Sequence, residues 1–146
     1  MEFRTLTASD LESLLELYKQ LNPANDAPSA EQSRIVWKEI EGNASIRYFG
    51  AVDGGRVVST CYAVCIPNLT QGCRSICFVE NVVTDQAYRG CGLASRVIDM
   101  AVDFAKEHHC YKVILQSGAS RTEAHRFYEH KGFSGTTKKA FDMRLE

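Results

Sequence analysis

The residues best suited to chemistry form a glycine-containing loop, Tyr88-Arg89-Gly90-Cys91-Gly92-Leu93-Ala94-Ser95. The loop follows a strand-like apolar run that ends at Val82-Val83-Thr84, and it opens an amphipathic helix. Glycine has no Cβ, so the backbone there can approach a ligand closely. The start of a helix adds unpaired N–H groups and the positive end of the helix dipole. These features predict a binding site for a phosphorylated ligand.

The loop lacks the fingerprints of two common nucleotide-binding turns. A Walker loop requires a lysine directly after its last glycine, and no lysine follows the glycines here. Ser95 stands where a Rossmann loop has a third glycine or an alanine. The spacing alone is therefore equally compatible with a plain strand-to-helix connection.

The elements that must position this loop follow from changes in hydrophobic period. A helix capped by Thr7 or Ser9 and carrying an apolar stripe from Leu11 to Leu21 is expected first. The other predicted helices cover about 30–41, the segment after the glycine loop, and Thr122–Lys131 with Gly132 at its C′ position. The predicted strands are Phe3–Leu6, Ile46–Val52, Arg56–Ile66, about Cys73–Thr84, Tyr111–Gln116 and about Lys138–Leu145. Asp53-Gly54-Gly55 predicts a hairpin between the second and third of these strands.

This order, β-α-α-β-β-β-α-β-α-β, predicts an α+β fold. We expect a single mixed, mostly antiparallel β-sheet with helices on both faces. The chain shows no internal repeat, low-complexity tract or linker, so residues 1–146 are expected to form one domain.

Composition narrows the function further. A formal net charge of −1 gives no basic field for nucleic acid or an anionic membrane. No apolar run approaches the roughly 20 residues that span a bilayer. Because the N-terminus has no secretory h-region, a cytoplasmic location is expected. The six cysteines include no Cys-x-x-Cys pair, so reduced thiols that pack as small hydrophobes are favoured over a metal site.

Two segments resemble the GNAT N-acetyltransferase superfamily. Residues 89–94 resemble its Arg/Gln-x-x-Gly-x-Gly/Ala loop, and residues 124–133 resemble its closing segment, Phe-Tyr-Glu-x-x-Gly-Phe. Their spacing and the order of elements also agree. The resemblance implies the GNAT (acyl-CoA N-acyltransferase) fold and acetyl-CoA as acyl donor, without a metal. The chain is then expected to be an acyltransferase that transfers groups other than aminoacyl groups.

By this resemblance, backbone amides of the glycine loop bind the CoA pyrophosphate. The residues concerned are Arg89, Gly90, Cys91, Gly92, Leu93, Ala94 and Ser95. Val82, Val83 and Thr84 would pair with the pantetheine arm, in a gap where the sheet splays before the strand near Lys112. Arg121 stands where many relatives carry an asparagine that helps to hold the pantetheine.

Glu80 and Tyr128 are the candidate catalytic residues. Attack by an alkylammonium requires loss of a proton, and a carboxylate in an apolar strand such as Glu80 can accept it. Tyr128 can donate a proton to the departing CoA thiolate, as the tyrosine of this segment does in many relatives. A carboxylate that faces solvent and a tyrosine that only anchors its helix are the structural alternatives. Cys91 would be misplaced for a covalent route, so direct transfer in a ternary complex is expected.

The acceptor is expected to be a primary amine, more readily a small one than a protein. Arg74 and Asn81 are polar residues that could orient it, or they could face solvent. The segment after Leu115 lacks the acidic pair of the family's glucosamine 6-phosphate enzymes, which argues against an amino-sugar phosphate. A catalytically silent acyl-CoA-binding module is the alternative function. The resemblance is compatible with a homodimer, which the residues themselves do not indicate.

Overall fold

The computed structural model describes residues 1–24 and 27–145 of the chain. They fall into two compact units, Met1–Ile114 and the residues from Leu115 onward, and each is taken by itself below. The expectation that residues 1–146 form one domain stays a prediction.

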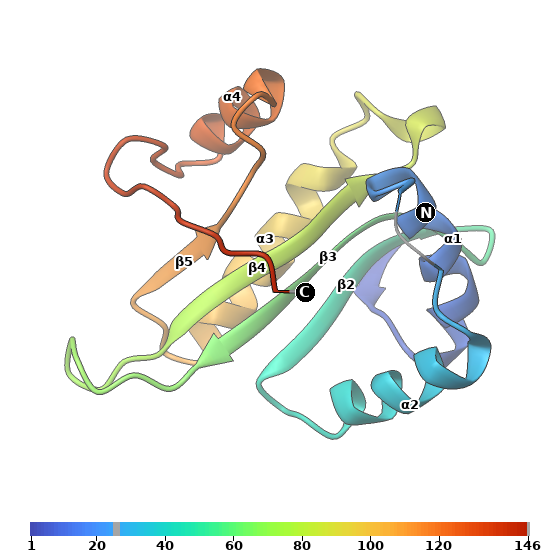
Figure 1. Cartoon of the computed structure of the whole chain (residues 1–146), viewed down its shortest axis with the longest axis horizontal. Coiled ribbons are helices and arrows are strands. Elements are labelled where there is room, and N and C mark those ends of the chain that lie inside the picture. Colours follow the sequence, from blue (N-terminus) through green and yellow to red (C-terminus); the bar gives the residue numbers. More distant parts are fainter. Residues whose placement is uncertain (25–26, 146) are drawn as a thin grey trace. The chain divides into compact units, whose positions relative to one another are not determined.

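The first unit is built around an open sheet whose strands lie in the order β1-β2-β3-β4-β5 (Figure 1). These strands are β1 (Glu2–Thr5), β2 (Ile46–Asp53), β3 (Arg56–Ile66), β4 (Ile76–Thr84) and β5 (Lys112–Leu115). The first four strands pair antiparallel with their neighbours. β5 follows a helical crossover and its arrow points the same way as that of β4 (Figure 1), so the sheet is mixed, as the sequence predicts.

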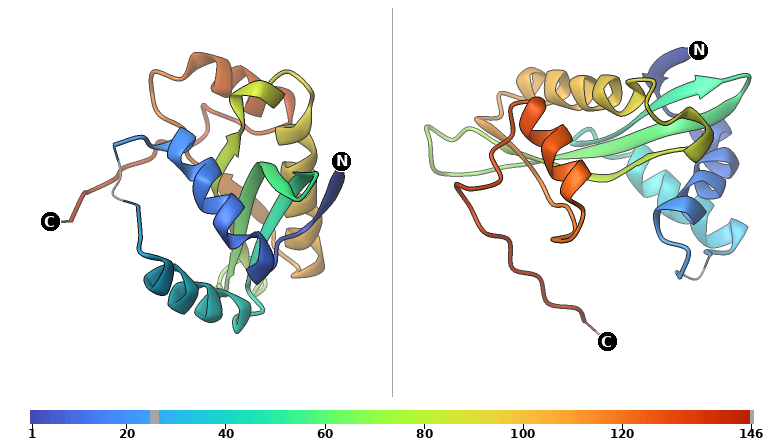
Figure 2. Two further views of the ribbon diagram at one scale, coloured as in Figure 1. Left: turned by 90° about the vertical axis from the view of Figure 1, so that its right-hand side faces the viewer. Right: turned by 90° about the horizontal axis from the view of Figure 1, so that it is seen from above.

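Helices cover both faces of this sheet. The first unit contains α1 (Leu11–Leu21), α2 (Ala30–Glu41) and α3 (Leu93–Glu107), and the second contains α4 (Thr122–His130). Figure 2 shows α3 on one face of the sheet, with α1 and α2 on the other. The predicted fold class is therefore confirmed.

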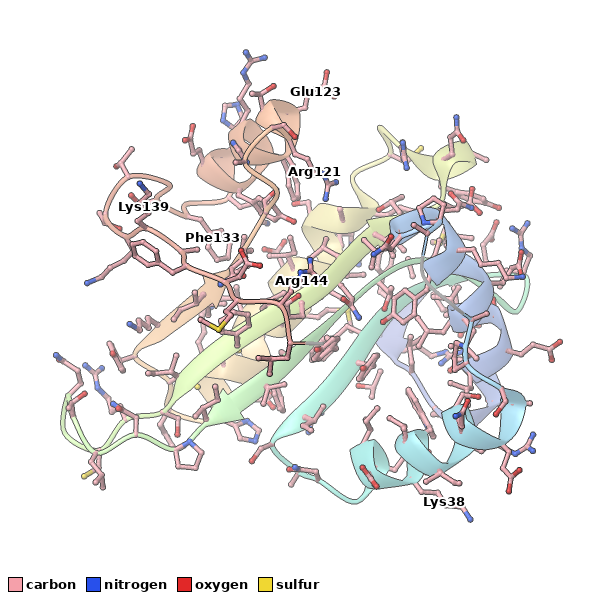
Figure 3. All side chains as sticks on the ribbon, in the orientation of Figure 1. Lys38, Arg121, Glu123, Phe133, Lys139 and Arg144 are labelled. Carbon is pink, nitrogen blue, oxygen red and sulfur yellow. The ribbon has the colours of Figure 1, made fainter. Side chains whose placement is uncertain are left out.

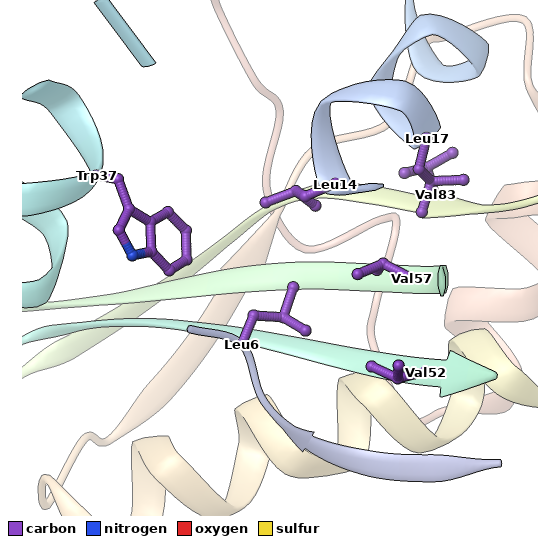
Figure 4. Packing of buried hydrophobic residues seen from close by; sticks show 7 residues of the cluster. All are labelled: Leu6, Leu14, Leu17, Trp37, Val52, Val57 and Val83. Atoms are coloured by element: carbon purple, nitrogen blue, oxygen red, sulfur yellow. The ribbon is translucent and has the colours of Figure 1, made fainter. Parts of the chain in front are cut away.

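Each face has its own core. Under α3, Phe104 packs edge-on against Phe49, with ring centroids 5.8 Å apart. On the opposite face a cluster joins α1 and α2 to the strands (Figure 4). Its buried members are Leu6, Leu14, Leu17, Trp37, Val52, Val57 and Val83. Burial of such side chains contributes roughly 1.5–3 kcal/mol each, so this cluster fixes α1 and α2 over the strands that carry the site.

An ion pair ties the end of β1 to the start of α1. Asp10 is buried, with 4% of its surface exposed, and accepts hydrogen bonds from both Nη atoms of Arg4 at 2.7 and 2.8 Å. The backbone N–H of Thr7 donates to the same carboxylate at 2.8 Å. The Arg4 hydrogen bonds hold the pKa of Asp10 below its usual value, against the opposing effect of burial.

We expect Asp10→Asn to lower the free energy of unfolding by about 1–3 kcal/mol, because charge-assisted hydrogen bonds to a buried group are lost. Since the folded-state pKa of Asp10 is depressed, its contribution is present above the unfolded pKa and is lost as pH falls through the folded pKa. Urea unfolding at neutral and acidic pH measures both effects. Glu2→Gln is the control, because Glu2 pairs with the same arginine at an exposed site and should cost under about 0.5 kcal/mol. Equal losses in the two variants would contradict the role of Asp10.

Two details of the predicted elements are wrong. No strand forms over 138–145 among the described residues, and the apolar residues that alternate there are exposed: Phe141 85%, Met143 85% and Leu145 89%. Alternation stabilises a strand only beside a partner edge. β4 begins at Ile76 rather than near Cys73, because Gln71, Gly72 and Cys73 take left-handed backbone conformations.

Candidate active site

The glycine loop has the backbone conformation that the predicted phosphate site requires. Gly90 and Gly92 have φ of +77° and +74°, in the left-handed region that favours glycine. Gly92 is also the N-cap residue of α3, and no side chain caps this helix start. A Cβ at either glycine would meet no protein atom within 4 Å, so the space beside both residues is open.

The first turn of α3 suits an anion. It contains no Asp or Glu, although acidic side chains commonly occupy that position in other helices. The first N–H groups of a helix have no intrahelical partner and point outward along its axis. Leu93 is buried and anchors the turn, while Gly90, Cys91 and Gly92 are exposed. The loop can therefore present amides to a diphosphate without displacing an acidic side chain.

Asp85 fixes the entry to this loop. Its buried carboxylate accepts from the Ala87 N–H at 2.9 Å and from Gln20 and Arg56 at 3.3 Å. The Arg89 guanidinium turns back to the carbonyl oxygen of Thr84, at 3.3 Å. The side chain of Arg89 thus supports the loop from behind, and the backbone faces outward.

Strand β4 carries an irregularity at the predicted site. Thr60 pairs with Val83 and Tyr62 pairs with Glu80, so β4 holds one residue more than β3 between these two pairs. Asn81, at φ +51°, lies in this β-bulge. Left-handed non-glycine residues are uncommon, and asparagine is among those that tolerate the conformation best. Bulges re-aim side chains and release backbone groups from pairing, and they often accompany active sites.

The far edge of β4 is only partly covered. β5 starts beside Ser75, whose carbonyl oxygen accepts from the Tyr111 N–H at 3.0 Å, and it has four residues against nine in β4. At about 3.3 Å per residue, β5 ends well before β4 does. Val83 and Thr84 pair with β3, Val82 lies beside Asn81 in the bulge, and no other described strand of the first unit extends along their far edge, which leads into the glycine loop.

Glu80 lies half-buried on the sheet face that α1 and α2 cover, directly opposite Tyr62. Burial raises the pKa of Tyr62, and the charge of Glu80 raises it further. The Tyr62 ring stacks on that of Tyr48, with centroids 4.6 Å apart and planes at 12°. The carboxylate therefore adjoins an aromatic surface beside the bulge, which is a setting in which it can accept a proton from a bound amine.

The two polar residues predicted to orient the acceptor lie at different places. Asn81 is next to Glu80 in the bulge. Arg74 is exposed before the start of β4, where its Nε donates to the carbonyl oxygen of Gln71 at 3.1 Å and its guanidinium lies over the Tyr111 ring. Six residues of extended chain correspond to roughly 20 Å, so the structure does not bring Arg74 to Glu80.

The second unit holds Tyr128 and Arg121. Tyr128 is half-buried in the last turn of α4, where its ring packs against Phe127 at 5.2 Å and Phe133 at 6.1 Å. Gly132, at φ +96°, ends this helix as predicted. Arg121 precedes the first residue of α4 (Figure 3), and its backbone N–H donates to Gly118 at 3.0 Å.

Sequence reasoning missed three aromatic residues of the first unit. Tyr18 on α1, Trp37 on α2 and Tyr48 on β2 line one cavity of about 490 Å³. Trp37 and Tyr48 pack edge-to-face, with centroids 5.3 Å apart. Tyr18 belongs to the apolar stripe predicted for the first helix, and Trp37 is among the residues of the second helix available for packing, but the sequence does not show that they meet Tyr48 around one cavity.

The buried thiols are poorly suited to nucleophilic chemistry. Burial raises the pKa of Cys61 to about 12 and that of Cys77 to about 11, and it raises the pKa of Cys65 as well. A raised pKa disfavours the reactive thiolate. No cluster of three or more His, Cys, Asp or Glu that could hold a metal occurs among the residues described. Within the same residues, every helix is too short or too polar to cross a membrane.

Comparison with known proteins defines the class. The model of the acetyltransferase (GNAT) family matches residues 11–133. A glucosamine 6-phosphate N-acetyltransferase of Trypanosoma brucei brucei is 32% identical over 146 residues, which cover 100% of this chain and 95% of that protein. The structure of a putative acetyltransferase from Agrobacterium tumefaciens superposes with a TM-score of 0.93 at 34% identity, covering 99% of this chain and 100% of that one. A glucosamine 6-phosphate N-acetyltransferase of Arabidopsis thaliana superposes with a TM-score of 0.84 at 26% identity, covering 99% and 97%.

An open mixed sheet, a bulged fourth strand and a glycine loop at a helix start together define an acyl-CoA-dependent transferase, and the chain belongs to the acetyltransferase (GNAT) family. It is an N-acetyltransferase that takes its acetyl group from acetyl-CoA and passes it to an amine.

Proposed function

We propose that this N-acetyltransferase acts on a small primary amine, which attacks acetyl-CoA directly in a ternary complex. The observation that carries the proposal is the arrangement along β4. A half-buried carboxylate, Glu80, is followed by a bulge at Asn81, then by an open edge, and then by the glycine loop. A base, a site for the acyl arm and a site for the diphosphate thus succeed one another along one strand.

The proposed cofactor contacts follow the same strand. Backbone amides of residues 89–95 bind the pyrophosphate, and Val82, Val83 and Thr84 pair with the amides of the pantetheine arm. We assign Arg121, in the second unit, to the pantetheine on the strength of the family resemblance. When bound, acetyl-CoA supplies an acyl group activated by its thioester.

In the proposed reaction, the C–S bond of the thioester breaks as the amine nitrogen bonds to the acetyl carbon. The alkylammonium loses two protons in all. Glu80 accepts the first proton and passes it to solvent. Tyr128 gives its phenolic proton to the departing thiolate, and the second proton from the nitrogen replaces it. Asn81 is proposed to orient the acceptor beside Glu80. Arg74 precedes β4, six residues of chain or roughly 20 Å from Glu80, and is not proposed for that role.

Glucosamine 6-phosphate is the second candidate acceptor. It is favoured because the Trypanosoma and Arabidopsis relatives are glucosamine 6-phosphate N-acetyltransferases, and the first is 32% identical over the whole chain. Release of free thiol from acetyl-CoA, measured with simple amines and with glucosamine 6-phosphate, tests the proposal. Turnover with at least one primary amine is expected, and turnover with none would contradict it. The cytoplasmic location and a homodimer stay predictions.

Gly92→Val is expected to weaken CoA binding roughly 5- to 30-fold. A left-handed conformation costs an L-residue about 1–2 kcal/mol, so the substituted loop leaves the conformation that presents its amides. A valine Cβ at Gly92 meets no protein atom within 4 Å, so the effect is conformational and not a clash with the fold. Calorimetric titration with CoA measures it.

Gly54→Val is the matched control for this prediction. Gly54 has φ of +54° in the hairpin between β2 and β3, with open space around it. Both variants should lose similar stability, and only the Gly92 variant should lose affinity for CoA. A folded Gly92→Val protein that binds CoA as tightly as the parent would remove the loop from the cofactor site.

A further inference from the structure

A cavity of about 490 Å³ opens between α1 and α2 above strand β2, entirely within the first unit. We call it the aromatic chamber. Figure 4 shows Leu14 of α1 and Trp37 of α2 on the same side of the sheet, and Tyr48 forms part of the chamber wall beneath them. Val36, with 52% of its surface exposed, lies at the mouth. The volume falls within the range of small-molecule sites.

The described residues of the chamber wall carry no charge. None of the described residues that line it is Lys, Arg, His, Asp or Glu. Lys38, next to Trp37 in sequence, points away from the strands (Figure 3). The polar groups of two lining residues are already engaged, since Ser33 Oγ donates to the carbonyl oxygen of Ala30 and Trp37 Nε1 donates to Glu41. A phosphate would therefore find no cation here, and its burial would be unfavourable.

One polar atom on the wall reaches the bulge. The Tyr18 hydroxyl is buried. Burial raises the pKa of Tyr18, while a hydrogen bond with the Asn81 side chain acts in the opposite direction. The hydroxyl therefore lies where the chamber meets the bulge beside Glu80.

The chamber is continuous with the proposed base. Tyr48, on its wall, stacks on Tyr62, and Tyr62 lies directly opposite Glu80. Two interstrand spacings separate Tyr48 from Glu80, which is roughly 10 Å. An amine held at Glu80 could therefore place a substituent two or three bonds away against these rings.

We propose that the aromatic chamber binds an aryl or branched alkyl group of the acceptor, so that the enzyme prefers a hydrophobic primary amine to a hexosamine phosphate. The inference rests on the proposed function, because Glu80 must mark the place of the reacting nitrogen. Tyr18, next to Asn81, then lies where the reacting end of the acceptor meets its hydrophobic group.

Matched acceptors test this specificity. Phenethylamine and ethanolamine share a primary amine and differ in the group that would enter the chamber. Burial of an aromatic ring predicts that kcat/KM for phenethylamine exceeds that for ethanolamine roughly 10- to 100-fold. Equal values, or a higher value for glucosamine 6-phosphate than for phenethylamine, would overturn the chamber and leave the proposed function standing. Turnover of no amine would overturn both.

Substitution at the mouth locates the effect. Val36→Trp should fill the chamber and bring the phenethylamine-to-ethanolamine ratio of kcat/KM towards one. Ile35→Trp is the control, because Ile35 is 54% exposed on the same helix and does not line the chamber. The control should keep the ratio of the parent. If Val36→Trp keeps it too, the hydrophobic preference arises elsewhere and the proposal is wrong.

Trp37 provides a readout that does not depend on turnover. It is the single tryptophan of the chain and lines the chamber. With CoA present, phenethylamine should change the Trp37 emission saturably, and ethanolamine at the same concentrations should not. An emission unchanged by phenethylamine would place the aryl group outside the chamber and overturn the proposal.

Discussion

Glu80→Gln should lower kcat for a primary amine about 10²- to 10⁴-fold near neutral pH, the usual contribution of a positioned general base. The substitution keeps the size of the side chain and removes its capacity to accept a proton. Glu80 is half-buried and lies opposite Tyr62, so water reaches this position less freely than it reaches an exposed carboxylate. Steady-state release of CoA thiol measures the effect.

The pH dependence of the Glu80 variant distinguishes a base from a structural carboxylate. Alkylammonium groups of the lysine type titrate near pH 10. Without a base, the rate should follow the fraction of free amine and rise about tenfold per pH unit below that value. Glu16→Gln, at an exposed position on α1, is the control and should leave rate and profile unchanged. A Glu80→Gln enzyme with the pH–rate profile of the parent would transfer the base role to water or to another group.

Tyr128→Phe is expected to slow acetyl transfer about 10²-fold and to change the affinity for CoA less than twofold. Phenylalanine keeps the ring contacts with Phe127 and Phe133, so α4 and its end should remain folded. What is lost is the phenolic proton that the thiolate receives. The prediction concerns kcat, since a proton donor to the leaving group acts in the transition state.

Tyr111→Phe serves as the comparison for this variant. Tyr111 interacts through its ring with Arg74 and Lys112, and it precedes β5. It should retain parental kcat and CoA affinity. If Tyr128→Phe also retains parental kcat, Tyr128 only anchors its helix, and another donor or water protonates the thiolate.

Much of the fold follows from local signals in the sequence. The turn Asp53-Gly54-Gly55 predicts the hairpin of β2 and β3, and the structure places these strands as expected. The segment Ala30–Glu41 begins with the cap Ser29, whose side chain accepts from Gln32 N–H, and its predicted bounds are those of α2. Such elements are predictable because caps, turns and periodicity act within a few residues.

The register of the sheet does not follow from the same signals. Counted from the pair Asp53–Arg56, Tyr48 should lie opposite Cys61, but a shift between Ala51 and Val52 places it opposite Tyr62. A one-residue slip moves side chains to the other face of a sheet. The stacking of Tyr48 on Tyr62 beside Glu80 could therefore not be predicted, although each tyrosine lies in a correctly predicted strand.

The parts of the site differ in how strongly the sequence indicates them. The glycine loop could be identified because glycine is the residue that most readily adopts positive φ, and Gly90 and Gly92 both do so. The bulge at Asn81 left a weaker signal, an asparagine within an apolar strand. The aromatic chamber left none, because it arises where α1, α2 and β2 meet and depends on packing between distant segments.

The central claim is that the glycine loop holds the diphosphate of CoA and directs the thioester along β4 towards Glu80. A crystal structure of the CoA complex tests it most directly. We expect pyrophosphate oxygens at about 2.7–3.2 Å from backbone nitrogens of residues 90–95, with pantetheine amides beside Val82–Thr84. A complex in which the pyrophosphate lies away from that loop, or the thiol points away from Glu80, would contradict the account.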